Sequence, residues 1–165
     1  MDTVSISISI GLFIIGVFLL IFILPVMNTK KRQKGMIAVL HALADRNNSI
    51  VGKKEIIGDV IVGLDETQGI LYYCKHNKVK DSSTSIQLKN VMQCKLINQM
   101  KKVKSSNENY NPYEKIGLEF VSKEKQHPRF IWEFYNVEET SQLNFDIKLL
   151  EKWERQINLT ISTYK

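Results

Sequence analysis

The alternation of hydrophobic and polar positions divides the chain into an apolar block, a short amphipathic segment and a long segment patterned like a β-rich domain. Residues 4–27 contain no charged side chain. A membrane-spanning helix needs about 20 apolar residues, and in lipid a helix satisfies its backbone whereas a lone strand cannot. We therefore expect a transmembrane helix over 4–27 after a short external N-terminus at 1–3. A secretory signal peptide is the alternative, but the only early charge is acidic Asp2 and no small-residue cleavage motif follows.

Residues 28–49 form a basic segment next to the apolar block. The positive-inside rule predicts that the N-terminus lies outside and the C-terminal domain in the cytoplasm, and the Ile-, Lys- and Asn-rich composition is typical of a bacterial protein, which indicates the bacterial inner membrane. Apolar residues recur at helical spacing within 33–46, which predicts an amphipathic helix. Its apolar face could lie on the membrane, pair with another chain or pack on the following domain, which we favour. The candidate contacts with the membrane surface are Lys30, Lys31, Arg32 and Lys34.

From residue 50 onward, short apolar runs separated by turn residues predict a series of β-strands. The loop 65–69 ends in Gly69, which supplies the positive φ that hairpin loops often need. Residues 101–112 and 122–128 are polar and are expected to form loops. The expected strands are 55–64, 70–75, 86–88, 91–97, 116–120 and 130–135.

After the last expected strand the hydrophobic period changes from 2 to 3.6, which predicts a C-terminal amphipathic helix over 143–161. We expect its apolar stripe to close the β core, with Trp153 as the most buried member. The fold class is therefore α+β: an N-terminal transmembrane helix, then a cytoplasmic domain at 50–165 built as a small antiparallel β barrel or sandwich capped by this helix. The stripe comprises Leu149, Leu150, Trp153, Ile157 and Ile161.

The order of strands followed by one amphipathic helix resembles pleckstrin-homology-like (PH-like) domains over residues 53–161. Trp153 stands where that family often carries a core tryptophan in its C-terminal helix. Phosphoinositide-binding members have basic residues around the first hairpin loop, whereas the loop taken for it here, 65–69, carries Asp65 and Glu66. The resemblance therefore implies a platform for protein contacts.

Net charge, sequence motifs and the two cysteines limit which ligands and activities we expect. The chain has 23 Lys and Arg against 17 Asp and Glu, for a net charge of +6, and much of the excess lies in the basic segment, so nucleic-acid binding is not expected. No phosphate-binding, metalloprotease or hydrolase motif is present in the sequence, so we expect no cofactor, no metal and no small-molecule substrate. Cys74 and Cys94 are predicted to be free, buried thiols. His76, two residues after Cys74, leaves a nucleophile or metal pair as a less favoured alternative.

These observations predict a non-enzymatic, membrane-anchored interaction module that contacts the bilayer through 4–27 and holds its domain at the cytoplasmic face. It would bind a protein partner or form a subunit of a membrane complex. One alternative is a sensor of anionic lipid headgroups, and a second is an enzyme of unrecognised type near Cys74 and His76. Outside the basic segment, the candidate contacts with a partner or a lipid are Lys123, Lys125 and Arg129.

Overall fold

The computed structural model describes residues 13, 17–18, 29–76, 81–100, 113–124, 129–140 and 142–164. The chain forms two compact units, Met1–Gly35 and Met36–Lys165. In the first unit, residues 29–35 are helical and exposed. The second unit contains the strands, the helical residues 36–46 and the C-terminal helix.

The predicted transmembrane helix requires a correction. Apart from residues 13, 17 and 18, the segment 4–27 lies outside the described residues. No helix in the described part of the chain is long and apolar enough to cross a membrane, because the helices at 29–46 and 147–162 both carry charged residues along their length. The expected fold class, as far as it includes a transmembrane helix, and the expected single-pass membrane localisation with a cytoplasmic domain are therefore wrong. From residue 29 on, the described structure is α+β, with two antiparallel sheets and two helices.

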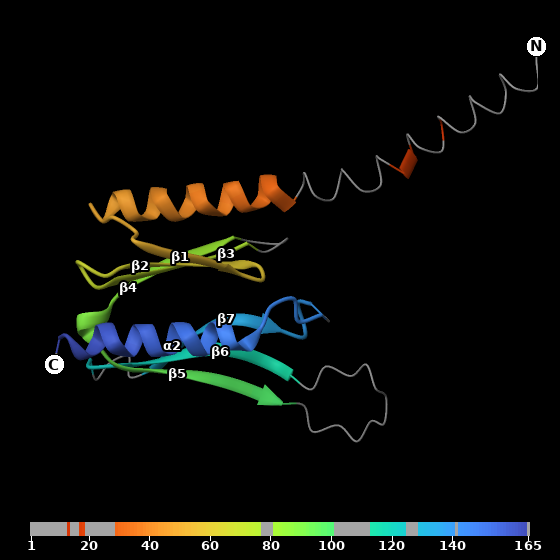
Figure 1. The fold of residues 1–165 in the computed structure, drawn as a ribbon. Helices are drawn as coiled ribbons and strands as arrows, with labels where there is room; N and C mark the ends of the chain where they lie inside the picture. The colour runs from red at the N-terminus through yellow and green to blue at the C-terminus, as the bar shows by residue number, and fades with distance from the viewer. Residues whose placement is uncertain are drawn as a thin grey trace, which may run out of the picture. The chain divides into compact units, whose positions relative to one another are not determined.

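Seven strands form the two sheets (Figure 1). A four-stranded sheet has the order β1-β2-β3-β4, and a three-stranded sheet has the order β5-β6-β7; all neighbouring strands are antiparallel. The short 3-10 helix η1, Leu88–Asn90, connects them. The bounds are β1 Lys53–Ile57, β2 Val60–Asp65, β3 Ile70–Lys75, β4 Ser82–Gln87, β5 Val91–Met100, β6 Tyr113–Ser122 and β7 Arg129–Asn136.

Two of the expected strands do not correspond to a single observed strand. The run 55–64 falls within a hairpin of two strands, β1 and β2, because Gly58 adopts φ 61° and begins a two-residue loop. The expected strand at 86–88 is the end of β4 and the start of η1. Most of β4 was missed because its serine-rich residues are exposed and give no hydrophobic alternation. Gly69 has φ 64° in the β2–β3 loop, as predicted.

Within the β1–β4 sheet, the central strands β2 and β3 are buried on both faces, which explains their nearly continuous apolar runs. Val62 and Leu71 belong to the core shared with the second sheet, whereas Ile61 and Tyr72 belong to a separate cluster under the helical residues 36–46. Gly63 permits the close approach of that helix, since a Cβ atom there would lie 2.9 Å from Leu40 Cδ1. The helical residues buried in this cluster are Met36, Leu40 and Ala44.

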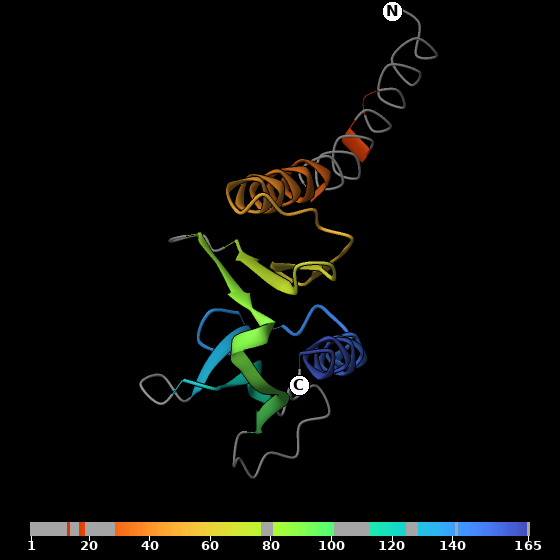
Figure 2. The same ribbon diagram turned by 90° about the vertical axis from the view of Figure 1, so that its left-hand side faces the viewer.

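The C-terminal helix, α2 Ile147–Ser162, begins four residues later than predicted, because Asp146 serves as its N-cap. The Lys148 N–H donates to Asp146 Oδ1 at 2.9 Å. Figure 2 shows α2 end-on. Leu149 is only partly buried, and Trp153, with 5% exposure, is slightly less buried than Leu150 and Ile157 at 0%, so the prediction that Trp153 is the most buried residue is wrong.

Candidate functional site

Helix α2 is bonded to one strand of each sheet. On one side, Trp153 Nε1 donates to Glu55 Oε2 of β1 at 2.7 Å. On the other, the Asn158 carboxamide pairs with the main chain of Cys94 in β5: Oδ1 accepts from the Cys94 N–H at 3.0 Å, and Nδ2 donates to the Cys94 carbonyl at 2.8 Å. The helix therefore joins the edge strands β1 and β5 through its polar side chains as well as through its apolar stripe.

A groove of about 430 Å³ lies between β1 and α2. We call it the β1–α2 groove. Trp153 gives the groove an apolar surface, although most of its ring is packed in the core. The carboxylate of Glu55 accepts the indole hydrogen bond and lies 3.8 Å from Lys152 Nζ. The groove is lined by Gly52, Lys53, Lys54, Glu55, Lys152, Trp153 and Gln156.

Three lysines belong to the groove lining, and their surroundings differ. Lys53 Nζ lies 2.9 Å from Glu66 Oε1, which also accepts from Gln156 Nε2 at 2.9 Å. Lys54 Nζ lies 3.0 Å from His41 Nε2, to which the ammonium group can only donate. The side chain of Lys152 is 68% exposed. The groove lining therefore presents ammonium groups, while its one lining carboxylate, Glu55, is already bonded to Trp153.

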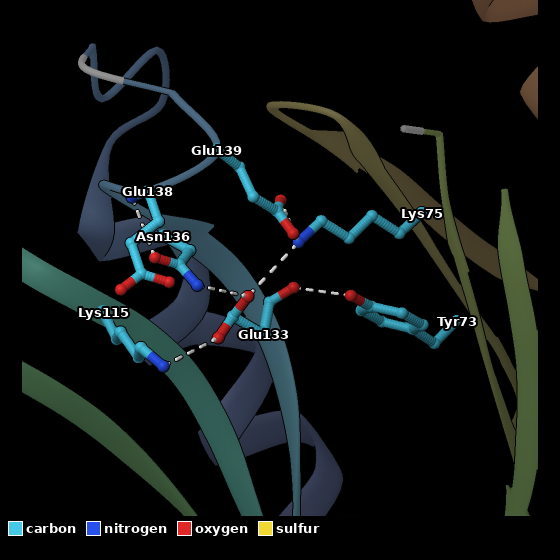
Figure 3. A network of polar contacts seen from close by, with 7 residues as sticks. All are labelled: Tyr73, Lys75, Lys115, Glu133, Asn136, Glu138 and Glu139. Atoms are coloured by element: carbon cyan, nitrogen blue, oxygen red, sulfur yellow. Dashed lines mark hydrogen bonds and ion pairs between the residues drawn. The ribbon is translucent and has the colours of Figure 1, made fainter. Parts of the chain in front are cut away.

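A polar network links β3 to β7 at a different place (Figure 3). Lys75 Nζ lies 2.7 Å from Glu139 Oε2 and 3.4 Å from Glu133 Oε1. The Tyr73 hydroxyl donates to the Glu133 carbonyl at 2.5 Å, and Asn136 Nδ2 donates to Glu133 Oε1 at 3.2 Å. Burial, with a smaller contribution from the two carboxylates, raises the pKa of Tyr73 well above its usual range, so the hydroxyl stays protonated. This network connects the two sheets, and its charges largely satisfy one another.

The structure places Cys74 and His76 in different environments. Cys74 is buried in the cluster under residues 36–46, and burial raises the pKa of its thiol to about 11. The thiol is therefore protonated at neutral pH and is a poor nucleophile. His76 Nδ1 lies 2.8 Å from Asp81 Oδ1, and both of these side chains are exposed. The predicted nucleophile or metal pair thus has no activated thiol.

Cys94 is also free and buried, as predicted. Burial is the main cause that raises the pKa of its thiol above the usual range, and the nearby Glu154 adds to it. Over the described residues, no group of three or more His, Cys, Asp or Glu side chains could hold a metal ion.

The residues that line the β1–α2 groove include none of the described basic residues proposed from the sequence. Lys123 follows the end of β6, and Arg129 begins β7, with Nη1 3.8 Å from Glu119 Oε1. Lys125 lies outside the described residues. The four predicted contacts with the membrane surface are exposed and helical in the first unit: Lys30, Lys31, Arg32 and Lys34.

Sequence reasoning missed the groove because its two walls lie about a hundred positions apart in the chain. The available signals were the Lys53-Lys54 pair at the start of an apolar strand and Lys152 beside Trp153. Neither signal indicates that β1 and α2 are neighbours.

No family model, no curated protein and no solved structure matches this chain. The PH-like resemblance therefore stays a prediction based on the order of elements.

Proposed function

We propose that the protein is a non-enzymatic recognition module that binds a partner protein in the β1–α2 groove. The observation on which this rests is the groove itself: about 430 Å³ between an edge strand and a helix, with Trp153 in its wall and lysines in its lining. Binding sites typically combine a concave, partly apolar surface with a few polar groups that fix orientation. Tryptophan is enriched among the residues that dominate binding energy at protein interfaces.

The surroundings of the two thiols support a non-enzymatic role. A catalytic cysteine needs a lowered pKa and access to substrate, whereas the pKa values of Cys74 and Cys94 are both raised by burial. Among the described residues that line the β1–α2 groove, Glu55 is the only carboxylate, and its bond to the Trp153 indole leaves it poorly placed to accept a proton from a substrate. The groove therefore suits binding better than proton transfer.

Site-specific photo-cross-linking tests this proposal. A photoreactive amino acid would replace Lys152, which is exposed in the groove, and in a second protein Lys89 of η1, which is exposed and outside the groove lining. We expect a discrete adduct with one protein from the Lys152 position and not from Lys89. The adduct should also fall when Lys54→Glu is added, because this reverses a groove charge. Equal cross-linking from both positions, or no effect of Lys54→Glu, would contradict the proposal.

A further inference from the structure

The outer edge of β1 presents main-chain groups to the β1–α2 groove. Ile57 and Val60 flank a two-residue loop, so they form a hydrogen-bonded pair. Because bonded and non-bonded pairs alternate along an antiparallel ladder, the N–H and C=O of Lys54 and Ile56 point away from β2. Residues 52–55 line the groove, so the outward-facing groups of Lys54 lie along it.

The other strand edges of the described structure are engaged by side chains or consist mainly of small polar residues. The Asn158 carboxamide bonds both main-chain groups of Cys94 at the β5 edge, and the Tyr73 hydroxyl bonds the Glu133 carbonyl of β7. Strand β4 is an exposed run of serines and threonine. Across the described residues, β1 pairs with β2 alone, and no side chain bonds the outward-facing groups of Lys54. An open edge of this kind is a template for another extended chain.

The contact between Asn158 and β5 shows that an amide group can bind the main chain of an edge strand in this molecule. Its side-chain amide places a C=O and an N–H against Cys94 as the peptide group of a neighbouring strand would. At β1 the corresponding place faces the groove, which leaves room for a peptide main chain. Strand addition is a common mode of peptide recognition, in which main-chain bonds give affinity and alternate side chains give specificity.

The charges of the groove indicate which side chains such a strand carries. Three lysines line it against one carboxylate, Glu55. Lys152 is 68% exposed, and Lys54 has the imidazole of His41 as its close polar neighbour. Ile50, two positions before the first lining residue in the sequence, is an apolar side chain with 84% exposure. An extended segment with alternating acidic and apolar residues matches this surface.

Resting on the function proposed above, we infer that the β1–α2 groove takes an extended acidic segment of its partner protein. The segment pairs with the outward-facing main chain of Lys54 as a further strand of the β1–β4 sheet. Because the side chains of a strand alternate between its two faces, the acidic side chains face α2 and approach Lys152, and the apolar ones point to the opposite face, which carries Ile56.

Fluorescence anisotropy with synthetic peptides and the purified full chain tests the chemistry. The probe is a labelled peptide of alternating valine and glutamate. One control replaces glutamate by lysine, and the other replaces valine by proline, which keeps the negative charge but removes the amide donor at alternate positions. We expect the valine–glutamate peptide to bind at least about tenfold more tightly than either control, a difference of about 1.4 kcal/mol.

A pair of protein variants tests the main-chain contact. In Lys54→Pro the outward-facing N–H is lost, and an edge strand tolerates proline where the N–H faces away from its neighbour. Lys54→Ala removes the same side chain but keeps the N–H. We expect Lys54→Pro to weaken binding of the valine–glutamate peptide about tenfold relative to Lys54→Ala. Circular dichroism measures whether both variants remain folded. If Lys54→Pro is unfolded, the comparison of the three peptides on the unmodified chain still tests the inference.

The outcomes separate this inference from the proposed function. Equal binding of the valine–glutamate and proline–glutamate peptides overturns strand addition, as does equal binding by the two folded Lys54 variants. Absence of binding by all three peptides also overturns it. In each case the cross-linking from position 152 decides the proposed function by itself, because it depends on neither the peptides nor the Lys54 main chain.

Discussion

At the scale of single residues, Asp65 is the buried charge with the most complete set of donors. It accepts hydrogen bonds from the Ser49 hydroxyl at 2.6 Å and from the Ile50 N–H at 3.1 Å. The Thr67 and Gln68 N–H groups complete the set at 2.8 and 2.9 Å. Burial by itself raises the pKa of the Asp65 carboxyl, but these hydrogen bonds outweigh it and hold the pKa below its usual value.

A prediction about pH follows from the lowered pKa of Asp65. Its ionised form stabilises the fold fully above the unfolded-state pKa of about 3.9, and this contribution is lost as the pH falls through the lower folded-state pKa. Asp65→Asn should lower the free energy of unfolding at pH 7 by about 1–3 kcal/mol. Urea denaturation should show this loss shrinking in acid. The exposed Glu151→Gln is the control, and a loss independent of pH would count against the assignment.

A second prediction at this scale concerns the stability of variants of two adjacent tyrosines. Among the described residues the Tyr72 hydroxyl has no hydrogen-bond partner and is buried, whereas the Tyr73 hydroxyl donates to the Glu133 carbonyl. Removing an unsatisfied hydroxyl relieves its desolvation cost, but removing a bonded one leaves the carbonyl unpaired. Tyr72→Phe should therefore leave the thermal midpoint unchanged or raise it, and Tyr73→Phe should lower stability by about 1 kcal/mol. The reverse order of the two midpoints would refute this account.

At the scale of elements, the C-terminal helix was predictable because its apolar stripe is regular. Leu150, Trp153 and Ile157 are buried as their spacing implied, although the start of the helix moved to the Asp146 cap. The β1–β2 hairpin was harder to predict, since the Gly58-Asp59 loop interrupts an otherwise continuous apolar run. Hydrophobic periodicity could not predict most of the serine-rich strand β4, because this strand is held by pairing with β3 and not by the burial of apolar side chains.

The packing of α2 on the core gives a prediction about stability, in which the neighbouring residue Lys152 serves as the control for Trp153. Trp153 packs in the core and bonds Glu55, whereas Lys152 projects into solvent. Trp153→Ala should cost about 3–5 kcal/mol, a large part of the roughly 5–15 kcal/mol that stabilises a typical domain. Lys152→Ala should change stability little and yet weaken binding in the β1–α2 groove. Denaturant midpoints of the full-length variants measure the first effect, and near-wild-type stability of Trp153→Ala would show that the helix is not needed to close the core.

At the scale of the whole molecule, sequence periodicity could predict a β-rich unit followed by a helix but not which elements become neighbours. The β1–α2 groove and the β3–β7 network both join residues far apart in the chain. The burial of β2 and β3 on both faces had a sequence signal in the nearly continuous apolar runs of these two strands. What covers each face follows from tertiary packing, which a single sequence does not encode in its local pattern.

Hydrogen–deuterium exchange of the full chain, with and without the valine–glutamate peptide, tests the central claim most directly. If the peptide adds to the open edge of β1, it should slow exchange at the Lys54 and Ile56 amides, which point away from β2. Amides of the exposed edge strand β4 should exchange at unchanged rates. Unchanged exchange at Lys54 and Ile56 under saturating peptide, or protection confined to β4, would contradict the account.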